Sequence, residues 1–223
     1  MTIATLIDKQ DNVEIIRDQI AAILAVEVAS QMALATTAAK DPLLWKLNVY
    51  LERSNPWEQW LNAQTDTSPI VNVWWTDSTF DDKASNVVER QKSQTVYNID
   101  CYGYGKCANN PGGGHYAGDE TAAKEAHRAL RLVRNILMSA EYTYLGLRPL
   151  VWRRLIQSIT VFQPQQDSNT AQQVVGSRLA LRVEFNEFSP QIPLETLELL
   201  TTEVFRAEDG QIVAEADYSY PLP

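Results

Sequence analysis

The chain has 223 residues, with 28 acidic against 19 basic side chains, so its formal net charge is −9 at neutral pH. A hydrophobic content of 45% is close to the globular average and excludes a disordered or fibrous chain. The acidic balance argues against a protein whose main task is to bind DNA phosphates. No run of about 18 apolar residues occurs, and the N-terminus has acids where a signal peptide needs bases, so we expect a cytosolic chain without a membrane span.

Two long helices are predicted from apolar residues that recur every three or four positions. The first begins at Asp11, which forms a capping-box sequence with Glu14, and extends to about Ala35. The second begins near Asp119, where acids suit the positive end of the helix dipole, and ends near Ala140. Its apolar stripe predicts that one face is buried. The opposite face carries the basic side chains of Lys124, Arg128, Arg131 and Arg134.

Strands are predicted where apolar residues alternate with polar ones, or where short β-branched runs stand between turn residues. The segments with this pattern are 47–51, 70–75, 94–102, 154–162 and 177–188. Two loops separate the later elements. One is rich in glycine and extends from Gly103 to Gly118, and the other is polar and extends from Gln163 to Gly176. Long loops of this kind are often functional.

The composition changes after Pro190, which divides the chain into a main domain, 1–190, and an extension, 191–223. The extension contains seven acids and one base, so it carries −6 of the net charge of −9. Glu208-Asp209-Gly210 is a turn signal between two short segments and predicts a β-hairpin. We therefore expect an α/β (α+β) fold with a mixed, mainly antiparallel sheet, two long flanking helices and a C-terminal β-hairpin extension.

The two cysteines and two histidines of the chain lie close together in sequence, at Cys101, Cys107, His115 and His127. Two thiolates and two imidazoles are a ligand set that Zn²⁺ accepts, but zinc sites usually place paired ligands two to five residues apart. These spacings are wider, and Cys101 lies on the apolar face of a predicted strand, where a thiol behaves as a small hydrophobic side chain. We assign no metal, cofactor or catalytic residue. A small metal-dependent enzyme that uses these four residues is the alternative.

The order of the predicted elements resembles the tail terminator proteins of tailed bacteriophages, also called tail-completion or head-to-tail joining proteins. The resemblance covers residues 11–188. It rests on residues 96–102 with the Ala-rich helix 119–140, and on the strands 154–162 and 175–185. It implies an α/β protomer, with a mixed sheet flanked by helices, that assembles as a ring, commonly a hexamer, on the last ring of the tail tube.

The resemblance also implies a structural function without enzymatic activity. The ring ends polymerisation of the tail tube protein and offers a docking surface to the connector and neck proteins of the head, with the sheath as a further partner. Genomic DNA passes through without specific binding, no membrane is involved, and the protein belongs to the virion after synthesis in the host bacterial cytoplasm. Another neck or adaptor protein of the same particle is a second alternative.

Three groups of residues are candidates for the contacts of such a ring. The first is the basic helix face described above, and the second is the polar loop with Gln165, Gln166 and Asp167. The third is the acidic extension, with Glu203, Glu208 and Asp209. Because acidic and basic surfaces attract each other, we expect the extension of one copy to contact the basic helix face of another copy or of an adjacent ring.

Overall fold

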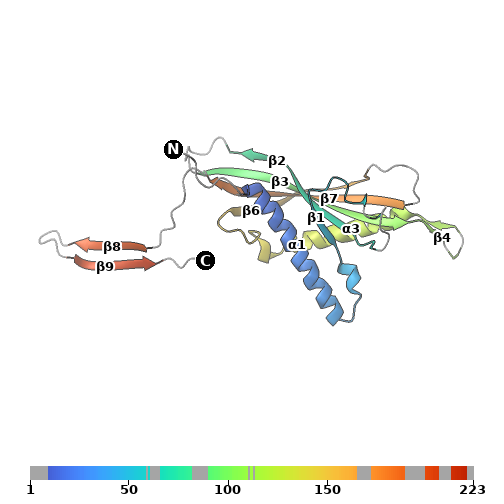
Figure 1. Ribbon diagram of the computed structural model, residues 1–223, viewed down its shortest axis with the longest axis horizontal. Helices are drawn as coiled ribbons and strands as arrows, with labels where there is room; N and C mark the ends of the chain where they lie inside the picture. Colours follow the sequence, from blue (N-terminus) through green and yellow to red (C-terminus); the bar gives the residue numbers. More distant parts are fainter. Residues whose placement is uncertain are drawn as a thin grey trace. The chain divides into compact units, whose positions relative to one another are not determined.

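The computed structural model describes residues 10–58, 60, 66–81, 90–109, 111–112, 114–164, 172–188, 199–205 and 212–219. The chain divides into two compact units, one of which is Ile7–Phe188. The other contains β8 (Leu199–Phe205) and β9 (Ile212–Ser219), which pair antiparallel. The larger unit has a mixed α+β fold, with one five-stranded sheet and two long helices (Figure 1), as the sequence predicts.

The five-stranded sheet is mixed, with the strand order β1-β2-β3-β7-β6. Its strands are β1 (Asn48–Leu51), β2 (Ile70–Phe80), β3 (Arg90–Lys106), β7 (Gln172–Phe188) and β6 (Val151–Phe162). Only the edge strand β1 pairs parallel, with β2, and the other three pairings are antiparallel. The strands β3 and β7 pair over 17 residues each and lie side by side through the middle of the unit (Figure 1). A small second sheet joins β4 (Ala108–Asn109) to β5 (His115–Tyr116).

Both long helices, α1 (Asn12–Thr37) and α3 (Gly118–Leu137), pack on the same face of this sheet. The predicted capping box is present: the Asp11 carboxylate accepts a hydrogen bond from the Val13 amide, and the Glu14 carboxylate accepts one from the Asp11 amide. Short 3-10 helices follow the two long ones, η1 (Pro42–Trp45) and η2 (Ala140–Tyr142). The shared core includes Ile16, Ile20, Leu24, Val73, Ile99, Val133, Leu137, Leu179 and Leu181.

The predicted glycine-rich loop from Gly103 to Gly118 is wrong in its first part, because β3 continues to Lys106. The glycines of this segment are needed for helix packing. A Cβ atom on Gly103 would lie 2.1 Å from the Ala122 carbonyl oxygen, and one on Gly105 would lie 1.9 Å from that of Gly118. The backbone of α3 therefore rests directly on β3, and only glycine fits there. Similarly, β7 begins at Gln172, inside the predicted loop 163–176.

By length and composition, α1 is apolar enough to cross a membrane, with a mean hydropathy of 1.6 over an 18-residue window. The core helix of a soluble protein passes the same test, and α1 packs one face on the sheet. The first half of α1 supplies most of this buried face. The second half is more exposed, and its C-terminal end extends beyond the sheet (Figure 1).

Candidate functional site

The cysteines and histidines that the sequence places together do not form a metal site in the described part of the chain. Cys101 is buried on the helix-covered face of β3, and burial together with the neighbouring Asp100 raises the pKa of its thiol. Cys107 is exposed after the end of β3, and His127 is exposed on α3. His115 lies in β5. The buried Cys101 thus behaves as a core residue.

The basic face of α3 is partly neutralised by acids of the same helix. Lys124 forms an ion pair with Glu120, one turn earlier. Arg128 donates from Nε and Nη2 to Glu125 Oε2, over 3.1 and 2.5 Å. The two remaining members of the face, Arg131 and Arg134, are exposed, and neither forms an ion pair with any residue that the structure describes. These two cations are the part of the face that is open to an acidic partner.

The other interface candidates lie mostly beyond the described residues. Gln165, Gln166 and Asp167 fall in the segment 165–171, and Glu208 and Asp209 fall in the segment 206–211, both outside the described ranges. Glu203 lies in β8, where its register partner in β9 is Glu215.

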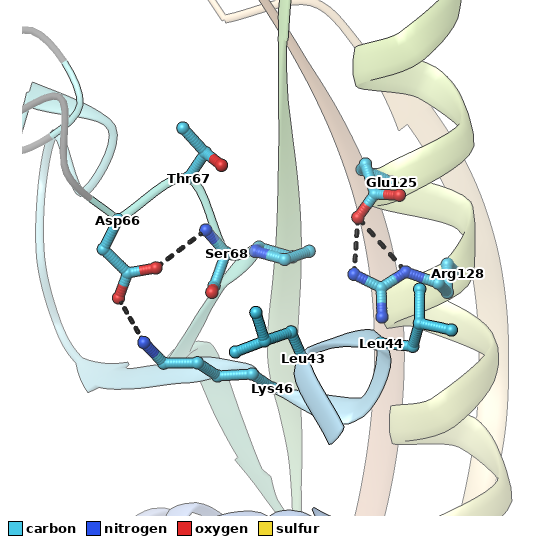
Figure 2. Close-up of a pocket in the computed structure, with 9 residues that line it drawn as sticks. Leu43, Leu44, Lys46, Asp66, Thr67, Ser68, Glu125 and Arg128 are labelled. Carbon is cyan, nitrogen blue, oxygen red and sulfur yellow. Dashed lines mark hydrogen bonds and ion pairs between the residues drawn. The ribbon is translucent and has the colours of Figure 1, made fainter. Parts of the chain in front are cut away.

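A pocket of about 340 Å³ lies between η1 and α3, on the helix-covered side of the sheet (Figure 2). We call it the η1–α3 pocket. Leu43 and Leu44 of η1 form one wall and are 60% and 52% exposed. The other walls are formed by Lys46, the segment Asp66–Pro69, and Glu125 and Arg128 of α3.

The four charged side chains of the η1–α3 pocket form two internal ion pairs, so they carry no net charge. Lys46 Nζ lies 2.7 Å from Asp66 Oδ2, and Glu125 pairs with Arg128 as described above. Burial acts to raise the pKa of Asp66, but hydrogen bonds from Lys46, Ser68 and Asn48 outweigh it and hold that pKa well below its usual range. Arg128 Nη1 is nevertheless buried without a hydrogen-bond partner among the described residues.

A second pocket, of about 390 Å³, lies on the opposite face of the sheet, which the helices leave uncovered. Its base is Asp100, which is 2% exposed. Arg178 donates from Nε and Nη2 to the two Asp100 oxygens, over 2.6 and 3.0 Å. Trp74 Nε1 and the Tyr102 hydroxyl also donate to Asp100 Oδ2, over 2.9 and 3.3 Å. Four donors therefore engage this carboxylate, three of them at Oδ2 and one at Oδ1.

Aromatic rings hold Arg178 in place above Asp100. Its guanidinium carbon lies 4.8 Å from the ring centre of Trp74 and 5.2 Å from that of Phe162. The hydrogen bonds to Asp100 raise the pKa of Arg178 above its already high value. Sequence reasoning missed this group, since Asp100 and Arg178 are 78 positions apart. The available signal was Asp100 within the largely apolar segment 96–102 of β3, whereas Arg178 is one of four charged residues in β7.

Large apolar side chains are exposed at several places on the larger unit, including Leu51 of β1, Trp75 and Phe80 of β2, and Trp152 of β6. In the edge strand β6, Ile159 is 43% and Val161 is 58% exposed. Leu43 and Leu44 are exposed at the η1–α3 pocket, and Val26 and Leu34 are exposed on α1. Contiguous exposed apolar surface commonly marks a contact with another protein.

Comparison with known proteins gives the chain no family. No family model matches it, and no curated protein matches it. Its function therefore has to be inferred from its own residues and geometry.

Proposed function

We propose that this protein is a structural virion protein of the phage tail or neck. In this proposal it caps the tail tube as a ring, ends tube polymerisation and provides the surface to which the head is joined. Its partners are other copies of itself in a hexameric ring, the tail tube protein, and the connector or neck proteins, with the sheath as a further candidate. The protein acts without a cofactor and has no enzymatic activity.

The observation that carries the proposal is the arrangement of the larger unit. A mixed sheet is flanked by two long helices, and its elements follow the order that the tail terminator resemblance implies. The segments of the resemblance correspond to β3, α3, β6 and β7, which contribute to a single sheet and its helical cover. Because a fold hosts many functions, this arrangement supports the proposal only together with surfaces suited to assembly.

The chemistry of the described surfaces also favours assembly over catalysis. The Asp100 carboxylate already accepts four hydrogen bonds, and the charged groups of the η1–α3 pocket form two ion pairs with one another. Apolar side chains are instead exposed on several elements, as expected of a subunit that buries some of them against a partner.

In this proposal the acidic extension supplies a contact between neighbouring copies. As a C-terminal β-hairpin it would contact a neighbouring copy, with its acids attracted to Arg131 and Arg134, the cations of the α3 face that have no acidic partner among the described residues. The net charge of −9 would repel DNA phosphates, so that a duplex slides through the ring without being held.

Polymerisation of the tail tube protein provides the direct test. The purified full-length chain is added to tube protein that is elongating, and tube length is measured by negative-stain electron microscopy. We expect shorter tubes with a ring at one end, at a stoichiometry of six copies per tube end by native mass spectrometry. If tube length does not change and the chain instead binds purified connector, another neck or adaptor protein is the better description.

A further inference from the structure

We propose that the second pocket, on the face of the sheet that the helices leave uncovered, is a binding site for a carboxylate group that is attached to an apolar body. We call it the open-face pocket. The side chains of Arg53 and Arg178 bind the carboxylate, and the aromatic rings of Trp57, Trp74 and Phe162 contact the apolar body. The proposal does not depend on the ring, since all of these residues belong to one copy.

Arg178 is fixed in a position that leaves part of its guanidinium free for a ligand. Its Nε and Nη2 atoms donate to Asp100, which is 2% exposed at the base of the pocket. Its Nη1 atom forms no hydrogen bond within the described ranges, and the side chain is 34% exposed. Because a guanidinium has more N–H donors than Asp100 engages, the others remain available to an acceptor in the pocket.

Arg53 is also positioned by a buried polar side chain. The Asn72 amide group, which is 3% exposed, accepts a hydrogen bond from the Arg53 backbone N–H over 3.0 Å and donates one to the Arg53 carbonyl over 2.9 Å. The Arg53 guanidinium carbon lies 4.3 Å from the centre of the Tyr50 ring. This guanidinium forms neither an ion pair nor a hydrogen bond with any residue that the structure describes, so its charge is available at the pocket.

The two buried side chains that hold these arginines lie next to each other in the sheet. Asn72 and Asp100 are opposite in the register of β2 with β3, and each of them binds one arginine residue. Buried polar groups are costly unless they are hydrogen-bonded. Glu52, just before Arg53, has a φ of +51°, and such strained backbone is typical of functional sites. This part of the sheet thus brings two cations to one cavity at some cost in stability.

The carboxylates at the open-face pocket are already engaged, whereas N–H donors remain free. Asp100 accepts four hydrogen bonds, and Glu52 accepts one from Arg17, which also pairs with Asp18. A ligand therefore has to supply acceptors. A carboxylate suits a guanidinium because its two oxygens align with two N–H groups. The two acids of the pocket also repel a doubly charged phosphate more strongly than a singly charged carboxylate.

Aromatic side chains give the open-face pocket an apolar part. Trp57, Trp74 and Phe162 line it and are each partly exposed. The ring centres of Trp57 and Tyr102 are 5.2 Å apart, and those of Tyr102 and Phe162 are 5.8 Å apart, so these rings pack against one another. The volume of about 390 Å³ is in the range of small-molecule sites. The apolar body of the ligand is therefore buried against these rings while its carboxylate binds the arginines.

Binding is tested on the full-length chain by ligand-observed saturation-transfer NMR and isothermal titration calorimetry. Phenylacetate represents a free carboxylate, and N-acetylphenylalanine represents the carboxylate at the end of a peptide. Their amides, phenylacetamide and N-acetylphenylalaninamide, have the same ring without the charge. We expect at least one carboxylate to bind in the millimolar range, as is usual for ligands of this size. It should bind about tenfold more tightly than its amide, because hydrogen bonds to charged groups are the strong ones. The tighter of the two carboxylates identifies the source of the ligand.

Matched arginine variants assign the binding to this pocket. Arg53→Gln should weaken carboxylate binding about tenfold and leave amide binding unchanged. The control Arg148→Gln removes another exposed arginine that lies over a ring, 3.7 Å from the centre of Tyr144, but does not line the pocket, and it should bind as wild type. Asp100→Asn/Arg178→Met removes the second guanidinium without leaving a buried carboxylate unpaired, and should also weaken binding. Circular dichroism checks that each variant has the wild-type spectrum.

Four results would overturn the proposal. They are the absence of binding by both carboxylates, equal binding of carboxylate and amide, tighter binding of inorganic phosphate than of either carboxylate, and an equal loss in Arg53→Gln and Arg148→Gln. None of these measurements depends on the oligomeric state. The proposed function is tested separately by the length of the tail tubes.

Discussion

Asp100 is a buried carboxylate on the face of the sheet that the helices leave uncovered, and its two oxygens accept four hydrogen bonds. Its partner Arg178 comes from β7, so this single side chain ties the two central strands together across the sheet. The pair is held from both sides by the rings of Trp74 and Phe162. Such a group contributes to stability mainly when both partners are present, because each compensates the buried charge of the other.

We expect Asp100→Asn to lower the free energy of unfolding by about 3 kcal/mol, the low end for breaking a buried ion pair, because Arg178 remains partly exposed. Urea unfolding followed by tryptophan fluorescence measures the change. The control is Asp77→Asn, an exposed position on β2, which should stay within about 0.5 kcal/mol of wild type. The double variant Asp100→Asn/Arg178→Met should be more stable than the sum of the single changes predicts, and strict additivity would contradict a coupled pair.

The depressed pKa of Asp66 makes a contribution to stability that depends on pH. A carboxyl whose pKa is lower in the folded state stabilises the protein above its unfolded pKa of about 3.9, and this stabilisation is lost as the pH falls through the folded pKa. We expect Asp66→Asn to cost about 1 kcal/mol at neutral pH, a modest value because the pair with Lys46 is partly exposed to solvent. The difference between variant and wild type in urea unfolding should shrink below about pH 4. A difference that does not change with pH would exclude the ion pair as its source.

Among the secondary-structure elements, β3 is the one whose glycines lead to a wrong prediction from the sequence. Gly103 and Gly105 suggest a loop, but in the structure they extend β3 and allow the helix backbone to rest on the strand. The sequence predicts both helices and all five strands of the main sheet, because amphipathic periodicity is a local property. It does not predict which distant residues meet, and the pairing of Asp100 with Arg178 and the two pockets depend on contacts across the whole unit.

Because α3 lies so close to β3, we expect even a methyl side chain at Gly103 to lower the free energy of unfolding strongly. Gly103→Ala would place a Cβ atom against backbone atoms of α3, at Ala122 and Ala126, which cannot rotate away. We expect a loss of roughly 3 kcal/mol or more in the free energy of unfolding, at the upper end for overpacking. Gly176→Ala is the matched comparison. Its Cβ meets the side chain of Phe162, which can move, so its cost should be smaller, about 1 to 2 kcal/mol. Equal costs in urea unfolding would show that helix contact is not the cause.

At the scale of the whole molecule, two kinds of contact between copies would respond differently to the salt concentration. Pairing between the acidic extension and Arg131 or Arg134 would be electrostatic, and exposed charges are screened within roughly 10 Å at 0.1 M salt. In the proposed ring, contacts between exposed apolar side chains would not be weakened by such screening. The ring should therefore persist when the electrostatic contacts weaken.

We expect the oligomer measured by sedimentation velocity to remain assembled when NaCl is raised from about 0.1 to 0.5 M, because screening weakens exposed ion pairs and leaves apolar contacts intact. The double variant Arg131→Gln/Arg134→Gln should likewise retain the ring, with a change limited to its association rate. Dissociation at the higher salt, together with loss of the ring in this variant, would assign the main contact to the basic face of α3.

The position of β7 between β3 and β6 has a consequence for how the protein folds. Both neighbours precede β7 in the chain. The residues of β3 pair with residues of β7 that lie 66 to 98 positions later in the sequence. Pairings of such long sequence separation form slowly, because loop closure has to precede the contacts that compensate for it. Until β7 is inserted, β6 and the β1-β2-β3 group are separate pieces. An incomplete nascent chain therefore lacks the link between the two edges of the sheet.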